Sequence, residues 1–188
     1  MLNDETATVT VKTDPLTIAQ ALRRIKKLKG RMGELTTRAA ASVSYQSDQK
    51  PAFDFAATRT EVETTREALI VIEAAVAKAN ALATVNFDGR AMTLAEAIRR
   101  LQEFKAEMAW LGGLTLRSGI ERHREPDYDQ ETGRTKVTVV TITFTSDLSE
   151  VQRAAELDKL RDRFERLNDL VEAANHRTAT DWRGSAEA

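Results

Sequence analysis

The sequence predicts an α+β protein that is mostly helical, with two helix–β-hairpin–helix units forming an antiparallel four-helix bundle and β-hairpins at one end. Three observations lead to this fold class. Only eight glycines and three prolines occur in 188 residues, which favours long helices. Apolar residues recur at helical spacing in four segments. The segment 16–35 also resembles 92–111, with eight of twenty aligned positions identical. A repeat predicts two similar units, because each copy must bury its apolar face against another.

These patterns indicate a single domain over 1–188, with one repeat unit at 14–85 and a second at 91–178. Val9 and Val11 alternate with polar residues, which predicts a short strand within 1–13. Residues 183–188 are small and polar, and we expect them to form a flexible tail.

Residues that favour helix N-termini mark the predicted helix starts. Asp14 followed by Pro15 predicts the first start, and Thr58 followed by Glu61 predicts the second. The third and fourth helices are predicted to begin at Thr93-x-x-Glu96 and near Asp147-x-x-Glu150. Between the second and third helices, 86–90 contains Asp-Gly and is interpreted as a tight connector.

The predicted β-hairpins lie within the repeat units. Segments 120–124 and 135–145 flank EPDYDQETG and are rich in β-branched residues, which is typical of a hairpin. By analogy, segment 42–56 predicts a shorter hairpin pairing Val43 and Tyr45 with Phe53 and Phe55. The 135–145 strand is apolar on both faces, so we expect it to need a partner sheet. Its own hairpin with the N-terminal strand, or a second subunit, would supply that sheet.

Composition argues against several classes of protein. Lys and Arg total 28 against 29 Asp and Glu, a balance that argues against a dedicated nucleic-acid binder. The absence of cysteine excludes disulfides and thiolate sites. The N-terminal residues do not resemble a secretory signal, and no apolar run approaches the ~18 residues of a membrane span. We therefore expect a cytoplasmic protein without a membrane span.

No residue pattern predicts a catalytic, cofactor or metal site, so we expect a protein that is not an enzyme and needs no cofactor. His123 and His176 lack a second ligand at metal-binding spacing. Asp127-x-Asp129-x-Glu131 resembles a calcium loop, but strands flank it and glycine is misplaced, which favours a solvated hairpin tip. The basic run 23–31 is interpreted as pairing with carboxylates such as the glutamates of the second helix, within the chain or between subunits, rather than with phosphates.

Three segments resemble the septicolysin-like family of small helical bacterial proteins. They are TIAQALRRIKK at 17–27, DGRAMTLAEAIRR at 88–100 and LRDRFERLNDLVEAANHRT at 160–178. The chain departs from that family's pattern at Gln20, Asn168, Val171 and His176, where the family has Glu, Asp, Ile and Trp. The resemblance implies a helical fold and a self-assembling scaffold rather than an enzyme, and it implies no catalytic residue.

The leading functional hypothesis is a homo-oligomeric assembly protein with hairpin-mediated contacts between subunits. The apolar hairpin residues predicted at that interface are Val43, Tyr45, Phe53, Phe55, Val137, Val139, Ile142 and Phe144. Trp110 is a candidate for a bundle contact or a second interface. One alternative is a clamp for a protein client, since helix pairs tipped with hairpins look like prefoldin, and a dye for exposed apolar surface would test it. A weaker alternative, following the family label, is a membrane-active protein, which liposome dye release would test.

Overall fold

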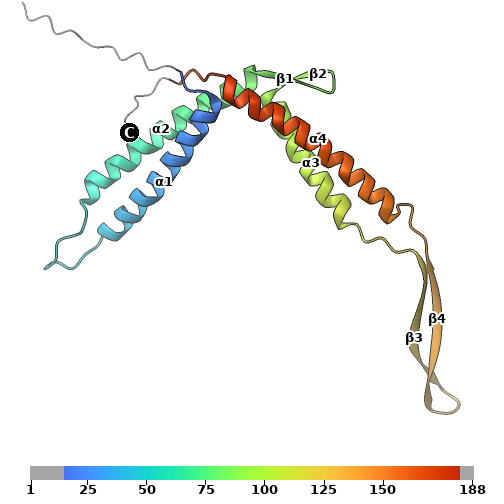
Figure 1. The fold of residues 1–188 in the computed structure, drawn as a ribbon. Helices are drawn as coiled ribbons and strands as arrows, with labels where there is room; N and C mark the ends of the chain where they lie inside the picture. The colour runs from blue at the N-terminus through green and yellow to red at the C-terminus, as the bar shows by residue number, and fades with distance from the viewer. Residues whose placement is uncertain (1–14, 183–188) are drawn as a thin grey trace, which may run out of the picture. The chain divides into compact units, whose positions relative to one another are not determined.

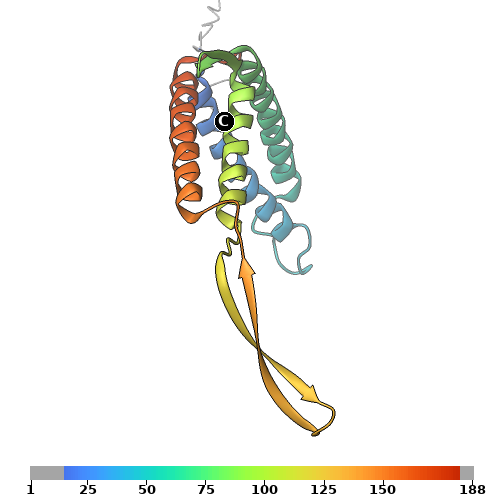
Figure 2. The same cartoon turned by 90° about the vertical axis from the view of Figure 1, so that its right-hand side faces the viewer.

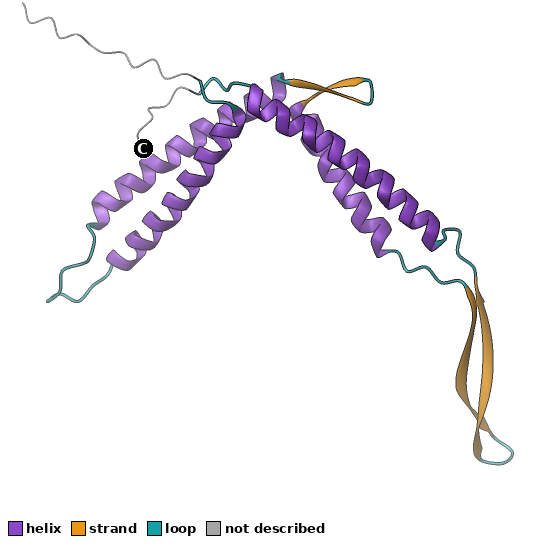
Figure 3. Ribbon diagram, in the orientation of Figure 1, coloured by secondary structure: helices purple, strands orange, loops and turns teal. Residues whose placement is uncertain are grey.

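The computed structural model describes residues 15–182, which form four helices and two antiparallel β-hairpins (Figures 1 and 3). In chain order the elements are α1 (Ile18–Ser42), α2 (Phe55–Leu82), β1 (Thr84–Phe87), β2 (Arg90–Thr93), α3 (Leu94–Gly113), β3 (Gly119–Asp129), β4 (Arg134–Phe144) and α4 (Glu150–Arg177). The predicted α+β, mostly helical class is therefore confirmed. The strand predicted within 1–13 and the tail at 183–188 lie outside the described residues.

The chain divides into two compact units. Of the described residues, the first comprises 15–99 together with 167–182, and the second comprises 100–166. Helices α3 and α4 therefore each contribute one end to the first unit and the remainder to the second.

The first unit is built on α1 and α2, which lie side by side (Figures 1 and 2). Its core is aliphatic, as the low aromatic content requires: Ile18, Ile25 and Leu28 of α1 are buried, and so are Leu69, Ile72 and Val76 of α2. Lys29 Nζ lies 2.7 Å from Glu73 Oε1, and Arg31 Nη2 lies 3.2 Å from Glu61 Oε2. The basic run of α1 thus pairs in part with α2 carboxylates, as predicted.

Two chain segments far apart in sequence meet beside α1. The backbone N–H of Ile18 donates to Thr178 O at 2.9 Å, and that of Thr180 donates to Leu16 O at 2.7 Å. The hydroxyl of Thr180, which is buried, donates to the same oxygen at 2.9 Å. These bonds fix the C-terminal end of α4 to the start of α1.

A β-hairpin, β1–β2, occupies the segment interpreted as a simple connector. Phe87 pairs with Arg90, and the two residues between them have positive φ, 51° at Asp88 and 78° at Gly89. Such a two-residue turn matches the twist of paired strands. Val85, Phe87 and Met92 are buried in the first unit. The predicted turn is confirmed, but the prediction of a connector without strands was wrong.

Two helices begin at residues other than those predicted, because a neighbouring residue caps the helix in place of the predicted one. Helix α1 begins after Thr17, whose hydroxyl accepts the backbone N–H of Gln20 while the Gln20 side chain accepts that of Thr17. This capping box takes the place predicted for Asp14. Helix α2 begins after Asp54, which accepts the N–H of Ala57 at 3.0 Å. Thr58, the predicted cap, lies inside the first turn and is buried.

The other two starts fall close to prediction. Thr93 Oγ1 accepts the backbone N–H of Glu96 at 3.1 Å, which confirms Thr93 as the cap of α3. For α4 the capping residue is Ser149, two residues after the predicted Asp147. Its hydroxyl accepts the N–H of Gln152 at 3.2 Å, and the Gln152 side chain accepts the N–H of Ser149 at 2.9 Å.

The hairpin predicted over 42–56 is absent, because residues 43–54 form a loop without a strand. A turn closes it where Gln49 N–H donates to Gln46 O at 2.9 Å. Only a few residues on each side alternate in character, and Pro51 lacks an N–H for a strand ladder. Capping by Asp54 then places Phe55 in the helix rather than in a strand.

The second unit consists of the remaining lengths of α3 and α4 and the hairpin β3–β4 (Figure 2). Phe104 and Leu111 of α3 and Leu160 of α4 are buried. Charged side chains cover two aromatic rings of these helices: Arg163 lies 5.1 Å from the ring centre of Phe104, and Lys105 lies 5.2 Å from that of Phe164. The predicted hairpin is confirmed and is longer than predicted.

Candidate functional site

The candidate site is the β3–β4 hairpin. Each strand has 11 residues, paired in unbroken register from Gly119↔Phe144 at the helical end to Asp129↔Arg134 at the turn. At about 3.4 Å per residue the ribbon is roughly 37 Å long. Within the described residues neither strand has a second neighbour, so both outer edges keep unpaired backbone groups.

Almost every described side chain of the hairpin is exposed to solvent; only Glu121, Val140 and Phe144 are half-buried. The exposed set includes large apolar side chains, with Ile120 at 68% and Val139 at 53% exposure. An isolated two-stranded ribbon is at best marginally stable in water. The side chains of this hairpin therefore form no hydrophobic core among the residues that the structure describes.

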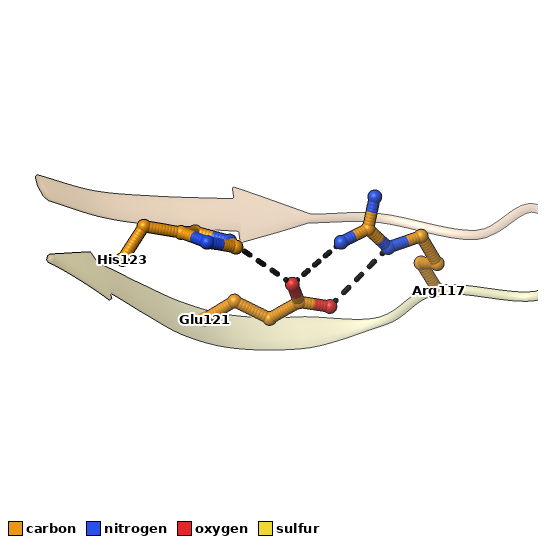
Figure 4. A network of polar contacts seen from close by, with 3 residues as sticks. All are labelled: Arg117, Glu121 and His123. Atoms are coloured by element: carbon orange, nitrogen blue, oxygen red, sulfur yellow. Dashed lines mark hydrogen bonds and ion pairs between the residues drawn. The ribbon is translucent and has the colours of Figure 1, made fainter. Parts of the chain in front are cut away.

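A polar network fixes the end of the hairpin nearest the helices (Figure 4). Arg117 contacts Glu121 through two nitrogens, at 2.5 and 3.3 Å, and its guanidinium lies 3.9 Å from the ring centre of Phe144. His123 Nε2 lies 3.3 Å from the same carboxylate. The hydrogen bond from Arg117 is the main cause that holds the pKa of Glu121 below its ordinary value, against a smaller opposing effect of desolvation. The carboxylate is kept ionised as an anchor, not poised as an acid or base.

Strand alternation divides the hairpin side chains between two faces, since residues directly opposite each other point to the same side. One face, the arginine face, carries Arg122 and Arg124 opposite Thr141 and Val139. Its full membership is Ile120, Arg122, Arg124, Pro126, Tyr128, Thr135, Val137, Val139, Thr141 and Thr143, all of them exposed. The other, the glutamate face, carries among others Glu121, His123, Glu125, Asp127, Lys136, Thr138, Val140, Ile142 and Phe144.

The structure separates the predicted interface residues into groups. Val137 and Val139 lie on the arginine face, whereas Ile142 and Phe144 lie on the glutamate face. Val43, Tyr45 and Phe53 are exposed in the 43–54 loop, Phe55 is exposed at the start of α2, and this group belongs to the first unit. Trp110, on α3, is 65% exposed. Sequence reasoning missed Ile120, Tyr128 and the two arginines, although their alternation along 120–128 was a readable signal.

The first unit has a shallow groove of about 500 Å³ on the outer side of α2. Its lining includes exposed Ile70 and Val71 and the ion pair between Lys78 Nζ and Asp181 Oδ2, which are 2.5 Å apart. That hydrogen bond from Lys78 holds the pKa of Asp181 below its ordinary value. The run ALIVIEAAVA at 68–77, in which Glu73 is the only charged residue, was the sequence signal for this surface.

Among the side chains that the structure describes, no group of three or more histidine, aspartate or glutamate residues is able to hold a metal ion. At the calcium-like pattern, Asp127 belongs to β3, Glu131 lies in the turn, and Gly133 has a φ of 64°. His176 lies in the last turn of α4. No helix in this described part of the chain is long and apolar enough to cross a bilayer.

Comparison with known proteins gives a family and a fold. Residues 25–180 match a family of unknown function, DUF6847, and the chain belongs to that family. A crystal structure of a functionally unknown conserved protein from Corynebacterium diphtheriae is similar, with a TM-score of 0.65 and 17% identity. The similarity covers 89% of this chain and 100% of that one, and it shows a shared fold. No curated protein matches the sequence.

Proposed function

We propose that this member of the DUF6847 family is a non-enzymatic, homo-oligomeric assembly protein whose β3–β4 hairpin makes the contacts between subunits. The observation that carries the proposal is an 11-residue-per-strand hairpin that exposes Ile120, Val137 and Val139 and leaves both edges unpaired. Long exposed apolar strands attract partner strands or sheets unless something covers them. A second hairpin of the same kind would cover an apolar face.

The proposal is consistent with the structural use of the polar network of Arg117, Glu121 and His123 at the root of the hairpin. The carboxylate of Glu121 serves to attach the ribbon to Arg117 and His123. An ion pair on the surface adds little to stability. We infer that this ion pair instead orients the hairpin, because it holds the first residues of β3 against Arg117.

Substituting Val139 by aspartate tests the proposal. We expect light scattering on a sizing column to give the wild-type chain a discrete multiple of 20.9 kDa and to give Val139→Asp a smaller mass. Burying a valine contributes about 1.5–3 kcal/mol, so removing it and burying a charge weakens association by at least roughly tenfold. Val151→Asp is the matched control, since Val151 is 79% exposed on α4, outside the hairpin.

A second variant guards against misfolding of the substituted ribbon. Replacing residues 119–144 by a short Gly-Ser linker removes the hairpin, and far-UV circular dichroism reports whether the helices persist. A wild-type monomer, or an oligomer that survives both changes, would contradict the proposal.

We also infer that the chain is an internal duplication whose four apolar helix stripes pack as a four-helix bundle. Residues 76 positions apart in α1 and α3 play matching roles: Thr17 and Thr93 cap their helices, and Ala21 and Ala97 are both fully buried. Further buried pairs in α1 and α3 have the same spacing of 76: Ile18/Leu94, Leu28/Phe104 and Leu35/Leu111. In α2 and α4 the buried pairs have a spacing of 95: Ile72/Leu167, Val76/Val171 and Ala79/Ala174. Matching burial at these positions supports a common ancestor for the two halves.

Small-angle scattering tests the bundle. A compact chain of this length has a radius of gyration of about 16 Å. We expect the hairpin-deleted variant to fall near or slightly below that value. A radius well above it would contradict the bundle and leave the duplication unaffected.

A further inference from the structure

The two faces of the β3–β4 hairpin differ in charge. The arginine face carries Arg122 and Arg124 and no acidic residue. The glutamate face carries Glu121, Glu125 and Asp127, with Arg134 and Lys136 nearer the turn. Of these three carboxylates, Glu121 is already paired with Arg117, and Glu125 and Asp127 remain for another partner, with Lys136 directly opposite Asp127 in the register.

The charged groups on the two faces also share one spacing. Arg122 and Arg124 are two residues apart on β3, and so are Glu125 and Asp127 on the same strand. Residues two apart along a strand lie about 7 Å from each other on one face. Both arginines of one ribbon are therefore able to meet both carboxylates of another at the same time. Within the described residues neither arginine forms an ion pair of its own.

We propose that the hairpin of a second copy of this chain packs its glutamate face against the arginine face of the first. This inference rests on the proposed function and specifies its geometry. The arginine face supplies exposed Val137 and Val139, and the glutamate face supplies Ile142 and Val140, so apolar contact accompanies the charge pairing. Two packed sheets lie about 10 Å apart, close enough for side chains of both faces to interdigitate.

Pairing of identical faces is disfavoured by the same residues. Two arginine faces would place Arg122 and Arg124 of one copy near those of the other, and like charges facing each other cost several kcal/mol in an interface. Opposed unlike faces form a head-to-tail contact, which uses two different surfaces of each subunit. Such contacts close into a ring or continue as a filament, rather than stopping at a symmetric dimer.

Charge reversal on each face tests the pairing. The variant Arg122→Glu/Arg124→Glu makes both faces negative, and Glu125→Arg/Asp127→Arg makes both faces positive. We expect each variant alone to associate at least tenfold more weakly than the wild type. An equimolar mixture of the two is expected to associate again, with the two variants alternating, because each variant offers the face charge that the other lacks. Added salt is expected to weaken wild-type association.

Two comparisons make the test decisive. Lys27→Glu/Arg66→Glu reverses two exposed bases outside the hairpin, and we expect it to retain the wild-type mass. If Val139→Asp dissociates the assembly while charge reversal has no effect, or while the mixture fails to recover, the face pairing is overturned and the hairpin interface stands. If Val139→Asp also has no effect, the proposed function fails with it. Dissociation by reversal of the arginines alone, with Glu125→Arg/Asp127→Arg still assembled, would mean that the arginine face binds a different surface of the second copy and would overturn the pairing of the two faces.

Discussion

Replacing Ile72 by alanine is expected to lower the free energy of unfolding by about 2–5 kcal/mol, because the change removes buried methylene groups and leaves a cavity. Ile72 has no exposed surface and lies in the middle of α2, facing the core of the first unit. Urea unfolding followed by far-UV circular dichroism measures the effect.

The neighbouring Ile70 supplies a matched control, since the same substitution is made on the same helix. Ile70 is 54% exposed on the outer side of α2. We expect Ile70→Ala to change the free energy of unfolding by less than about 1 kcal/mol, as surface substitutions usually do. Equal losses at both positions would mean that the outer face of α2 is as tightly packed as the inner face.

Valine in place of Gly89 is expected to destabilise the first unit by about 1–2 kcal/mol, because an L-residue pays this much in a left-handed conformation. Gly89 has a φ of 78°, and a Cβ there would meet no other atom within 4 Å. Backbone strain is thus the only source of the effect. Thermal unfolding of the wild type and of Gly89→Val measures the difference between their melting temperatures.

Gly89→Asn is the control for that substitution, because asparagine tolerates positive φ. We expect its melting temperature to lie between those of the wild type and Gly89→Val. A melting temperature for Gly89→Val equal to that of Gly89→Asn would show that the β1–β2 turn relaxes at no cost.

Helix content was readable from the sequence because it depends on local patterns. Thr93 was correctly placed as a cap, since its hydroxyl and the backbone of Glu96 lie three residues apart. The error at α1 was a choice between two local signals: Asp14-Pro15 and the capping box of Thr17 and Gln20 both mark a start, and the reciprocal bonds of the box prevail.

The hairpins were harder to read, because a strand is defined by its partner. The 42–56 hairpin was inferred from the repeat and was wrong, since duplicated helices do not oblige their connections to match. The β1–β2 hairpin was missed although Asp88-Gly89 sits between the alternating residues Val85 and Phe87 and the buried Met92. That pattern is a strong short-range hairpin signal, and it was read only as a turn.

The candidate site was partly readable. The apolar residues of β4 stood out by composition, which led to Val137 and Val139. The assignment of charges to faces requires the register of β3 against β4, and register is a property of the paired strands. The sequence therefore predicted the hairpin, but not that its two faces differ in charge.

The exposure of β3–β4 has a consequence for how the family evolves. Among its described side chains none is buried within one chain, so substitutions there leave the packing of the helical core unchanged. A ribbon of this kind is free to change its recognition properties while the helices stay constant. Under the proposed assembly through the hairpin, paralogues in one cell would diverge at the hairpin first, so that each copy assembles with its own kind and mixed assemblies are avoided.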